Sequence, residues 1–157
     1  MNDKYHFDQS AVIPYRVNNG TVEILLITSI RKKRWIVPKG FIEFNLSAFE
    51  SAKKEAYEEA GVLGTNETIE LGTFSINKYG GELSIKVYSM EVVEEHEDYP
   101  EKNLRKRKWF SIEEAENKIN IFSQRKIYNK PYELFILLLI SKFSNKNYIL
   151  IERQISL

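Results

Sequence analysis

A loop followed by a helix, from Pro38 to Val62, constrains this chain more than any other segment. Its sequence is PKGFIEFNLSAFESAKKEAYEEAGV. Ser47 and Glu50 have the spacing of a capping box, which predicts that a helix begins directly after Ser47. Gly61 supplies a left-handed stop, so we expect a helix over residues 48–60. A glycine-bearing loop leads straight into this helix.

Three glutamates share one face of the expected helix. Glu55, Glu58 and Glu59 fall within an arc of about 100°, beside an apolar stripe of one phenylalanine and three alanines. Like charges at i,i+4 cost a helix about 0.2–0.5 kcal/mol in water and more where solvent is excluded, so a compensating cation is expected. Mg²⁺ fits, since it prefers oxygen ligands and is commonly completed by substrate phosphates. The alternative is a solvated acidic face balanced by Lys53 and Lys54.

The same stretch resembles the Nudix box, G-x5-E-x7-R-E-U-x-E-E-x-G-U, in which U is a bulky aliphatic residue. Two charged positions differ from the pattern, because Leu46 stands in place of its first Glu and Lys54 in place of its Arg; Ala56 is also smaller than the usual aliphatic. In the family that Arg and Glu help to orient the metal-binding carboxylates, and an Arg fork holds two oxygens where Lys offers a point charge. Leu46 removes an acid that would lack its Arg partner. The matching positions are Gly40, Glu55, Glu58, Glu59, Gly61 and Val62.

The resemblance implies an α/β fold, namely a Nudix-type α/β/α sandwich with a mixed central β-sheet. It implies a pyrophosphohydrolase that cleaves a phosphoanhydride bond with Mg²⁺, or Mn²⁺ as the alternative. Glu55, Glu58 and Glu59 would hold the metal together with the carbonyl of Gly40. Glu55 or Glu58 would be the catalytic general base. Glu43 in the loop is a secondary candidate for contact with metal or water.

The resemblance extends over about residues 9–143. RKKRWIVPKGFIE and EVVEEHEDYPEKNLRKRKWFSIEEA are similar to the diadenosine polyphosphate and diphosphoinositol polyphosphate hydrolase branch of the family. We therefore expect a dinucleoside polyphosphate or another nucleoside diphosphate-linked substrate first, and a diphosphoinositol polyphosphate second. The other hypothesis is a Nudix-fold nucleotide-binding regulatory module with weak or no turnover, which Leu46 and Lys54 favour. The substrate-binding candidates, each with a solvated surface cation as its alternative, are Arg16, Arg31, Lys39 and Arg105.

Composition narrows the class of protein. The length of 157 residues and the 43% of hydrophobic residues predict one domain over 1–157, and zero cysteines exclude disulfides and thiolate metal sites. The net charge of +1 gives no global bias toward nucleic acid or membrane, and the acidic segment Glu91–Glu101 argues against a nucleic-acid role for the basic run Arg105–Lys108. The longest apolar run, Leu134–Ile140, is too short to cross a bilayer. We expect a cytoplasmic monomer or homodimer that acts on a small molecule.

Turn and periodicity signals predict the remaining elements, in an order typical of the sandwich. The tail over 144–157 reads as β-like and either packs on its own domain or forms an intersubunit strand. The other expected elements are a hairpin of Ser10–Arg16 with Val22–Ile30, a strand Trp35–Val37, a hairpin of Ile69–Ile76 with Leu83–Val93, a strand Lys108–Phe110, a helix opening at Ser111, and a helix from about Asn129 to Phe143 with Pro131 in its first turn.

Overall fold

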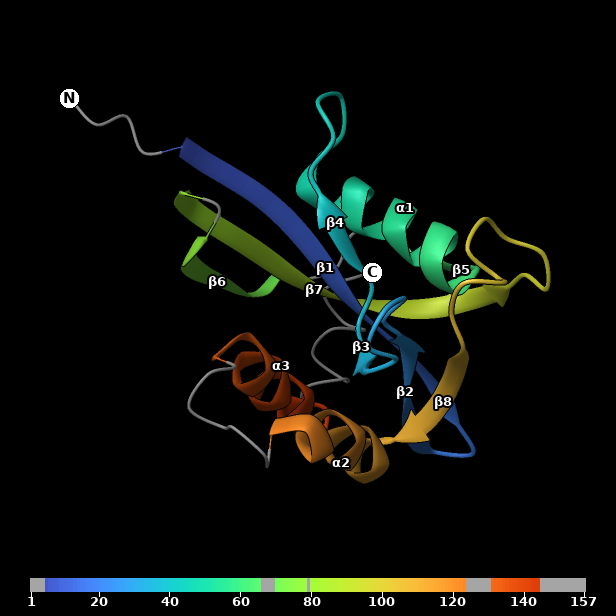
Figure 1. The fold of residues 1–157 in the computed structure, drawn as a ribbon. Coiled ribbons are helices and arrows are strands. Elements are labelled where there is room, and N and C mark those ends of the chain that lie inside the picture. Colours follow the sequence, from blue (N-terminus) through green and yellow to red (C-terminus); the bar gives the residue numbers. More distant parts are fainter. Residues whose placement is uncertain (1–4, 66–69, 79, 124–130, 145–157) are drawn as a thin grey trace.

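A mixed β-sheet with helices on both faces forms the core of the computed structural model (Figure 1), which describes residues 5–65, 70–78, 80–123 and 131–144. The strands are β1 (Tyr5–Asn18), β2 (Thr21–Thr28), β3 (Trp35–Ile36), β4 (Lys39–Phe41), β5 (Val62–Gly64), β6 (Glu70–Lys78), β7 (Gly81–Glu95) and β8 (Arg107–Ser111). The helices are α1 (Ala48–Ala60), α2 (Ile112–Ser123) and α3 (Pro131–Lys142). This is the α/β/α sandwich that the sequence predicts.

The sheet is built around two long central strands. Its order is β3-β2-β1-β7-β5, with β4 paired to β1, β6 to β7 and β8 to β2. β1 and β7 run parallel from Tyr5 opposite Gly81 to Tyr15 opposite Glu91, whereas the other described pairs are antiparallel. The predicted first hairpin is confirmed, and its turn places Asn19 and Gly20 at φ 51° and 77°.

Helix α1 has the predicted bounds because both of its ends are fixed by local hydrogen bonds. The backbone N–H of Glu50 donates to Ser47 Oγ at 3.1 Å, and the Ser47 N–H donates to the Glu50 carboxylate at 2.8 Å. Gly61 ends the helix at φ 66°. The apolar stripe of α1 packs on one face of the sheet, in a buried cluster of Val12, Leu25, Ile27, Phe49, Ala52, Ala56, Ala60, Val62, Tyr88 and Met90.

Helices α2 and α3 cover the opposite face. Successive residues of a strand point to opposite sides, so Ala11 and Ile13 of β1 join the cluster under α2 and α3, whereas Val12 joins the cluster under α1. The same alternation applies to β4, which pairs with β1 in the register Ser10 opposite Gly40 and Ala11 opposite Lys39. Gly40 therefore faces α1, and Lys39 faces α3.

The predicted second hairpin is confirmed as the antiparallel pair β6 and β7, which extends further at its turn than expected, and the predicted strands Trp35–Val37 and Lys108–Phe110 are β3 and β8 with slightly different bounds. The Ser111–Glu114 capping box is confirmed at the start of α2. The sequence reading missed β4 and β5, both only three residues long. The predicted start of the last helix at Asn129, and the tail after residue 144, lie outside the described residues. No helix in the described part of the chain combines the length and apolar character needed to cross a membrane.

Candidate active site

A buried pair of carboxyl groups on α1 is the centre of the candidate site. The side chains of Glu55 and Glu59, one helical turn apart, hydrogen-bond to each other, and Glu59 is only 5% exposed. Burial raises the pKa of Glu59 to about 9, and the hydrogen bond and charge of Glu55 add to that rise. Burial also raises the pKa of Glu55. In the absence of a cation, the pair therefore keeps a proton near neutral pH.

Gly40 brings the backbone of β4 against this pair. A Cβ at residue 40 would lie 2.8 Å from Cγ of Glu55 and closer still to its carboxyl group. The absence of a side chain is therefore a steric requirement of the close approach between β4 and α1. The two carboxyl groups and the adjacent backbone offer the hard oxygen donors that Mg²⁺ prefers.

Arg105 lies beside the pair as the sequence reading proposed. Its Nη2 atom is 3.6 Å from Glu59 Oε2, and its side chain is only 12% exposed. Two further contacts hold the guanidinium, since Nε donates to Glu101 at 2.6 Å and Nη1 donates to the Thr28 carbonyl at 3.1 Å. The positive charge of Arg105 lowers the pKa of Glu59 and so opposes the effect of burial.

Glu58 is paired with Lys54. Its carboxylate lies 3.3 Å from Lys54 Nζ, and the same ammonium group donates to Glu43. Glu43, predicted as a secondary metal or water contact, is thus bound to Lys54. Among the residues that the structure describes, no group of three acidic or histidine side chains converges as a ready metal cage. The pair of Glu55 and Glu59 fits a divalent cation, and Glu58 would join it only after leaving Lys54.

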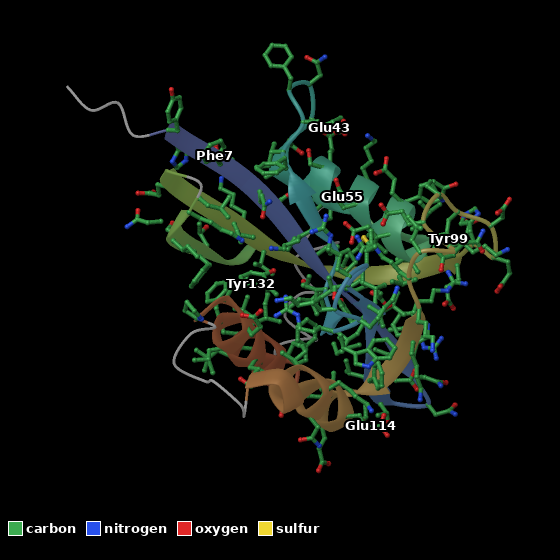
Figure 2. All side chains as sticks on the ribbon, in the orientation of Figure 1. Phe7, Glu43, Glu55, Tyr99, Glu114 and Tyr132 are labelled. Atoms are coloured by element: carbon green, nitrogen blue, oxygen red, sulfur yellow. The ribbon has the colours of Figure 1, made fainter. Side chains whose placement is uncertain are left out.

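Lys39 lies on the other side of β4, in a cavity of about 270 Å³ between β4, β6 and α3. Its Nζ atom is 4.7 Å from the centre of the Tyr132 ring. Figure 2 shows Glu55 on the α1 side of the sheet and Tyr132 on the α3 side. Burial lowers the pKa of Lys39, with a smaller contribution from the nearby Lys78. When Glu59 is ionised, its charge raises the pKa of Lys39 and of Tyr132, so the cavity and the carboxyl pair are electrostatically linked.

Two polar groups of the cavity are not among the predicted site residues. Arg34 Nε and the Tyr132 hydroxyl are buried and have no hydrogen-bond partner within the described part of the chain. Arg34 belongs to the same basic run as Arg31, and the composition of that run is a weak signal for phosphate binding. Tyr132 gave none, because only tertiary packing brings the first turn of α3 to β4. Such groups favour a polar or charged ligand in the cavity.

The structure does not gather every predicted substrate-binding residue around the pair. Arg16 forms a two-pronged ion pair with Glu23, directly across the first hairpin, at 2.8 and 2.7 Å. Its guanidinium also stacks 4.2 Å from the centre of the Trp109 ring. Arg31 is exposed in the loop between β2 and β3. Of the four predicted cations, Arg105 and Lys39 are therefore the two that lie closest to the carboxyl pair.

Comparison with known proteins agrees with this arrangement. The family model of the NUDIX domain matches residues 7–131. The chain is 30% identical over 102 residues to Nudix hydrolase 12, mitochondrial, of Arabidopsis thaliana, covering 60% of this chain and 50% of that protein. It is 40% identical over 96 residues to human diphosphoinositol polyphosphate phosphohydrolase 3-alpha, covering 59% and 57%. The chain thus spans little more than half the length of these curated relatives.

Solved structures share the fold. The crystal structure of C. elegans Ap4A hydrolase has a TM-score of 0.63 and 21% sequence identity, covering 89% of this chain and 97% of that one. A NUDIX hydrolase from Nitrosomonas europaea has a TM-score of 0.64 and 18% identity, covering 89% and 88%. At these identities the likeness establishes the architecture alone.

Proposed function

The chain belongs to the NUDIX domain family, and we propose that it is a metal-dependent hydrolase that cleaves a phosphoanhydride bond beside Glu55 and Glu59. The observation that carries the proposal is this pair of carboxyl groups, buried on α1 against the backbone of Gly40. Two acids with raised pKa values at one point are costly without a cation. The pair therefore fits a role in metal binding better than a role in stability.

The residues have distinct tasks in the proposed reaction. Glu55, Glu59 and the Gly40 carbonyl would hold Mg²⁺ or Mn²⁺, which when bound supplies Lewis-acid polarisation of the phosphoryl oxygens and of the attacking water. To bind the cation, the pair would have to release the proton that it shares. We assign Glu58 as the proton acceptor for the water, because its carboxylate is 34% exposed whereas Glu55 faces Glu59.

Arg105 would stabilise negative charge at the same point. Its guanidinium is held by Glu101 and Thr28, so it is oriented before substrate arrives. A buried arginine in a fixed position stabilises developing charge without reorganising during the reaction. The reacting phosphates would thus lie between the cation on α1 and the Arg105 side chain.

Two neighbouring segments, 29–34 and 102–108, support a polyphosphorylated substrate. Two hydrogen bonds hold the segments side by side. Lys106 N donates at 2.9 Å to Oγ1 of Thr28, which directly precedes the first segment, and Lys33 Nζ donates to the Leu104 carbonyl at 3.3 Å. Because the whole chain has a net charge of only +1, this basic surface is a local concentration of charge. Its exposed cations are Arg31, Lys32, Lys33, Lys102, Lys106 and Lys108.

The basic surface adjoins the candidate site through Arg105, which belongs to the second segment and contacts Glu59. A substrate with its scissile bond at Glu59 would extend its remaining phosphates over these cations. We therefore propose dinucleoside polyphosphates as the first substrate class and diphosphoinositol polyphosphates as the second. The name of the human relative supports the second class.

A nucleotide-binding regulatory module without turnover is the second candidate function. The observation that favours it is the ion pair between Lys54 and Glu58, which occupies one of the expected catalytic carboxylates. A binding module would be stabilised by ligand but would release no product. An enzyme would be stabilised by ligand and would also release product.

A substrate panel with Mg²⁺ and with Mn²⁺ tests the proposal, using wild type and Glu59→Gln. We expect metal-dependent hydrolysis by the wild type, with a preference for polyphosphorylated substrates. Glu59→Gln keeps the shape of the side chain but removes a ligand charge, so turnover should fall roughly a hundredfold or more. Wild-type turnover by this variant at saturating Mg²⁺ would reject the metal assignment, and ligand stabilisation without product would establish the binding module.

A further inference from the structure

Lys54 bridges two carboxylates from different parts of the chain. Its ammonium group donates to Glu43, in the loop between β4 and α1, and lies 3.3 Å from Glu58 Oε1, one turn along the helix. Leu46, which stands where the Nudix pattern has an acid, carries no charge. The partner of the basic residue at position 54 is therefore an acid that the box pattern does not specify.

Glu43 is fastened to α1 at its backbone as well. Its N–H donates to Ser51 Oγ at 3.0 Å, and the Ser51 side chain is buried, with the residue only 2% exposed. The Glu43 carbonyl accepts the N–H of Leu46 at 3.1 Å. The backbone of Glu43 is thus held by hydrogen bonds that do not involve the ion pair, and its carboxylate accepts from Lys54. Figure 2 shows Glu43 where the loop from β4 approaches α1.

We propose that Glu43, acting through Lys54, is a positioning residue that takes over the task of the acid absent at Leu46. By sharing the ammonium group, Glu43 keeps Lys54 from closing fully onto Glu58, so that Glu58 stays free to turn toward a cation at Glu55 and Glu59. This inference rests on the proposed function, because it concerns the metal site of that function. One difference from the family pattern then accounts for both Leu46 and Lys54: the acidic partner of the basic residue is at position 43 and not at position 46.

The half-exposed ion pair contributes little to stability, since the side chains of Lys54 and Glu43 are 43% and 47% exposed. Loss of Glu43 should therefore leave the fold intact and act on metal affinity. With Gln at position 43, Lys54 has only the Glu58 carboxylate as a charged partner. The ammonium group of Lys54 then competes with the metal cation for Glu58. The expected result is a weaker metal site in a protein of unchanged thermal stability.

The experiment measures the Kd of the 157-residue chain for Mn²⁺ and Mg²⁺ by calorimetry, without substrate. Glu43→Gln should raise the Kd at least threefold. Glu50→Gln is the matched control, because it removes one negative charge close to the same loop while glutamine still completes the capping box; its Kd should stay within twofold of wild type. In a Lys54→Met background, Glu43→Gln should change the Kd no more than Glu50→Gln does.

A second variant repeats the test in the opposite direction. Combining Glu43→Gln with Leu46→Glu and Lys54→Arg rebuilds the ion pair of the family pattern and should restore the wild-type Kd. The inference is overturned if Glu43→Gln behaves like Glu50→Gln, if its effect is the same with and without Lys54, or if the rebuilt pair leaves the Kd at the value of Glu43→Gln. A wild-type chain that binds neither ion and hydrolyses no phosphoanhydride would reject the proposed function itself.

Discussion

The metal-free protein should lose stability as the pH rises from 6 to 8, because Glu59 keeps a proton in the folded state. Burial raises its pKa from the ordinary 4.5 to about 9, so between these values the folded chain binds more protons than the unfolded chain. The free energy of unfolding then falls with pH, by about 1.4 kcal/mol per unit for one retained proton. From pH 6 to pH 8 the loss should be about 3 kcal/mol.

Urea unfolding in the presence of EDTA, at pH 6, 7 and 8, measures this loss. Glu59→Gln cannot ionise, so its free energy of unfolding should fall less steeply than that of the wild type. Glu58→Gln is the matched control, because it removes a carboxyl group from the same helix at a position that is 34% exposed; it should keep the wild-type slope. Equal slopes for wild type and Glu59→Gln would show that Glu59 does not hold the proton.

Added Mg²⁺ should weaken this pH dependence. A cation that displaces the proton binds more tightly as the pH rises, so it should stabilise the protein more at pH 8 than at pH 6. Glu59→Gln should lose most of this stabilisation. A wild-type increment that is the same at both values of pH would indicate that the cation binds elsewhere on the chain.

Four further substitutions test the site and its cations. Gly40→Ala should weaken Mg²⁺ affinity roughly tenfold or more in calorimetry, since its Cβ overlaps the Glu55 carboxyl group and displaces a ligand; unchanged affinity would contradict the close approach. Tyr132→Phe should raise the free energy of unfolding by about 1 kcal/mol in urea titrations, because the buried hydroxyl has no partner in the described residues; destabilisation would reveal a missed hydrogen bond. Arg31→Ala and Lys39→Ala should lower kcat/KM more for a dinucleoside polyphosphate than for ADP-ribose, with the salt dependence larger at the exposed Arg31; equal losses on both substrates would remove the support for polyphosphate recognition.

Local signals predicted the parts of the fold that depend on local hydrogen bonds. Helix α1 has its predicted bounds because Ser47, Glu50 and Gly61 specify both ends within one stretch of chain. The parallel pairing of β1 with β7 joins residues 5–15 to residues 81–91, and no short-range pattern encodes such a register. The short strand β4 exists only because β1 offers it an edge, which explains why its composition gave no signal.

The residues of the candidate site also divide into those that local sequence predicts and those that depend on tertiary contacts. Helical periodicity was sufficient to place Glu55 and Glu59 together, since they lie one turn apart. It does not decide whether Glu58 joins them, because Glu58 pairs with Lys54, which also binds a loop residue eleven positions earlier, Glu43. The side of the sheet on which Lys39 lies required the register of β4, because a shift of one residue would have exchanged it with Gly40.

The parallel pairing of β1 with β7 also determines when the sheet can form during translation. The strand that emerges first has its partner 76 residues later, from Tyr5 to Gly81, so the centre of the sheet stays incomplete while that interval is translated. At about 5–20 residues per second the wait is roughly 4–15 s. During this time the apolar residues of β1 lack their final neighbour, and the helix that carries the acids has no finished surface on which to settle. Segments that are exposed in this way during translation are natural targets for chaperones on the ribosome.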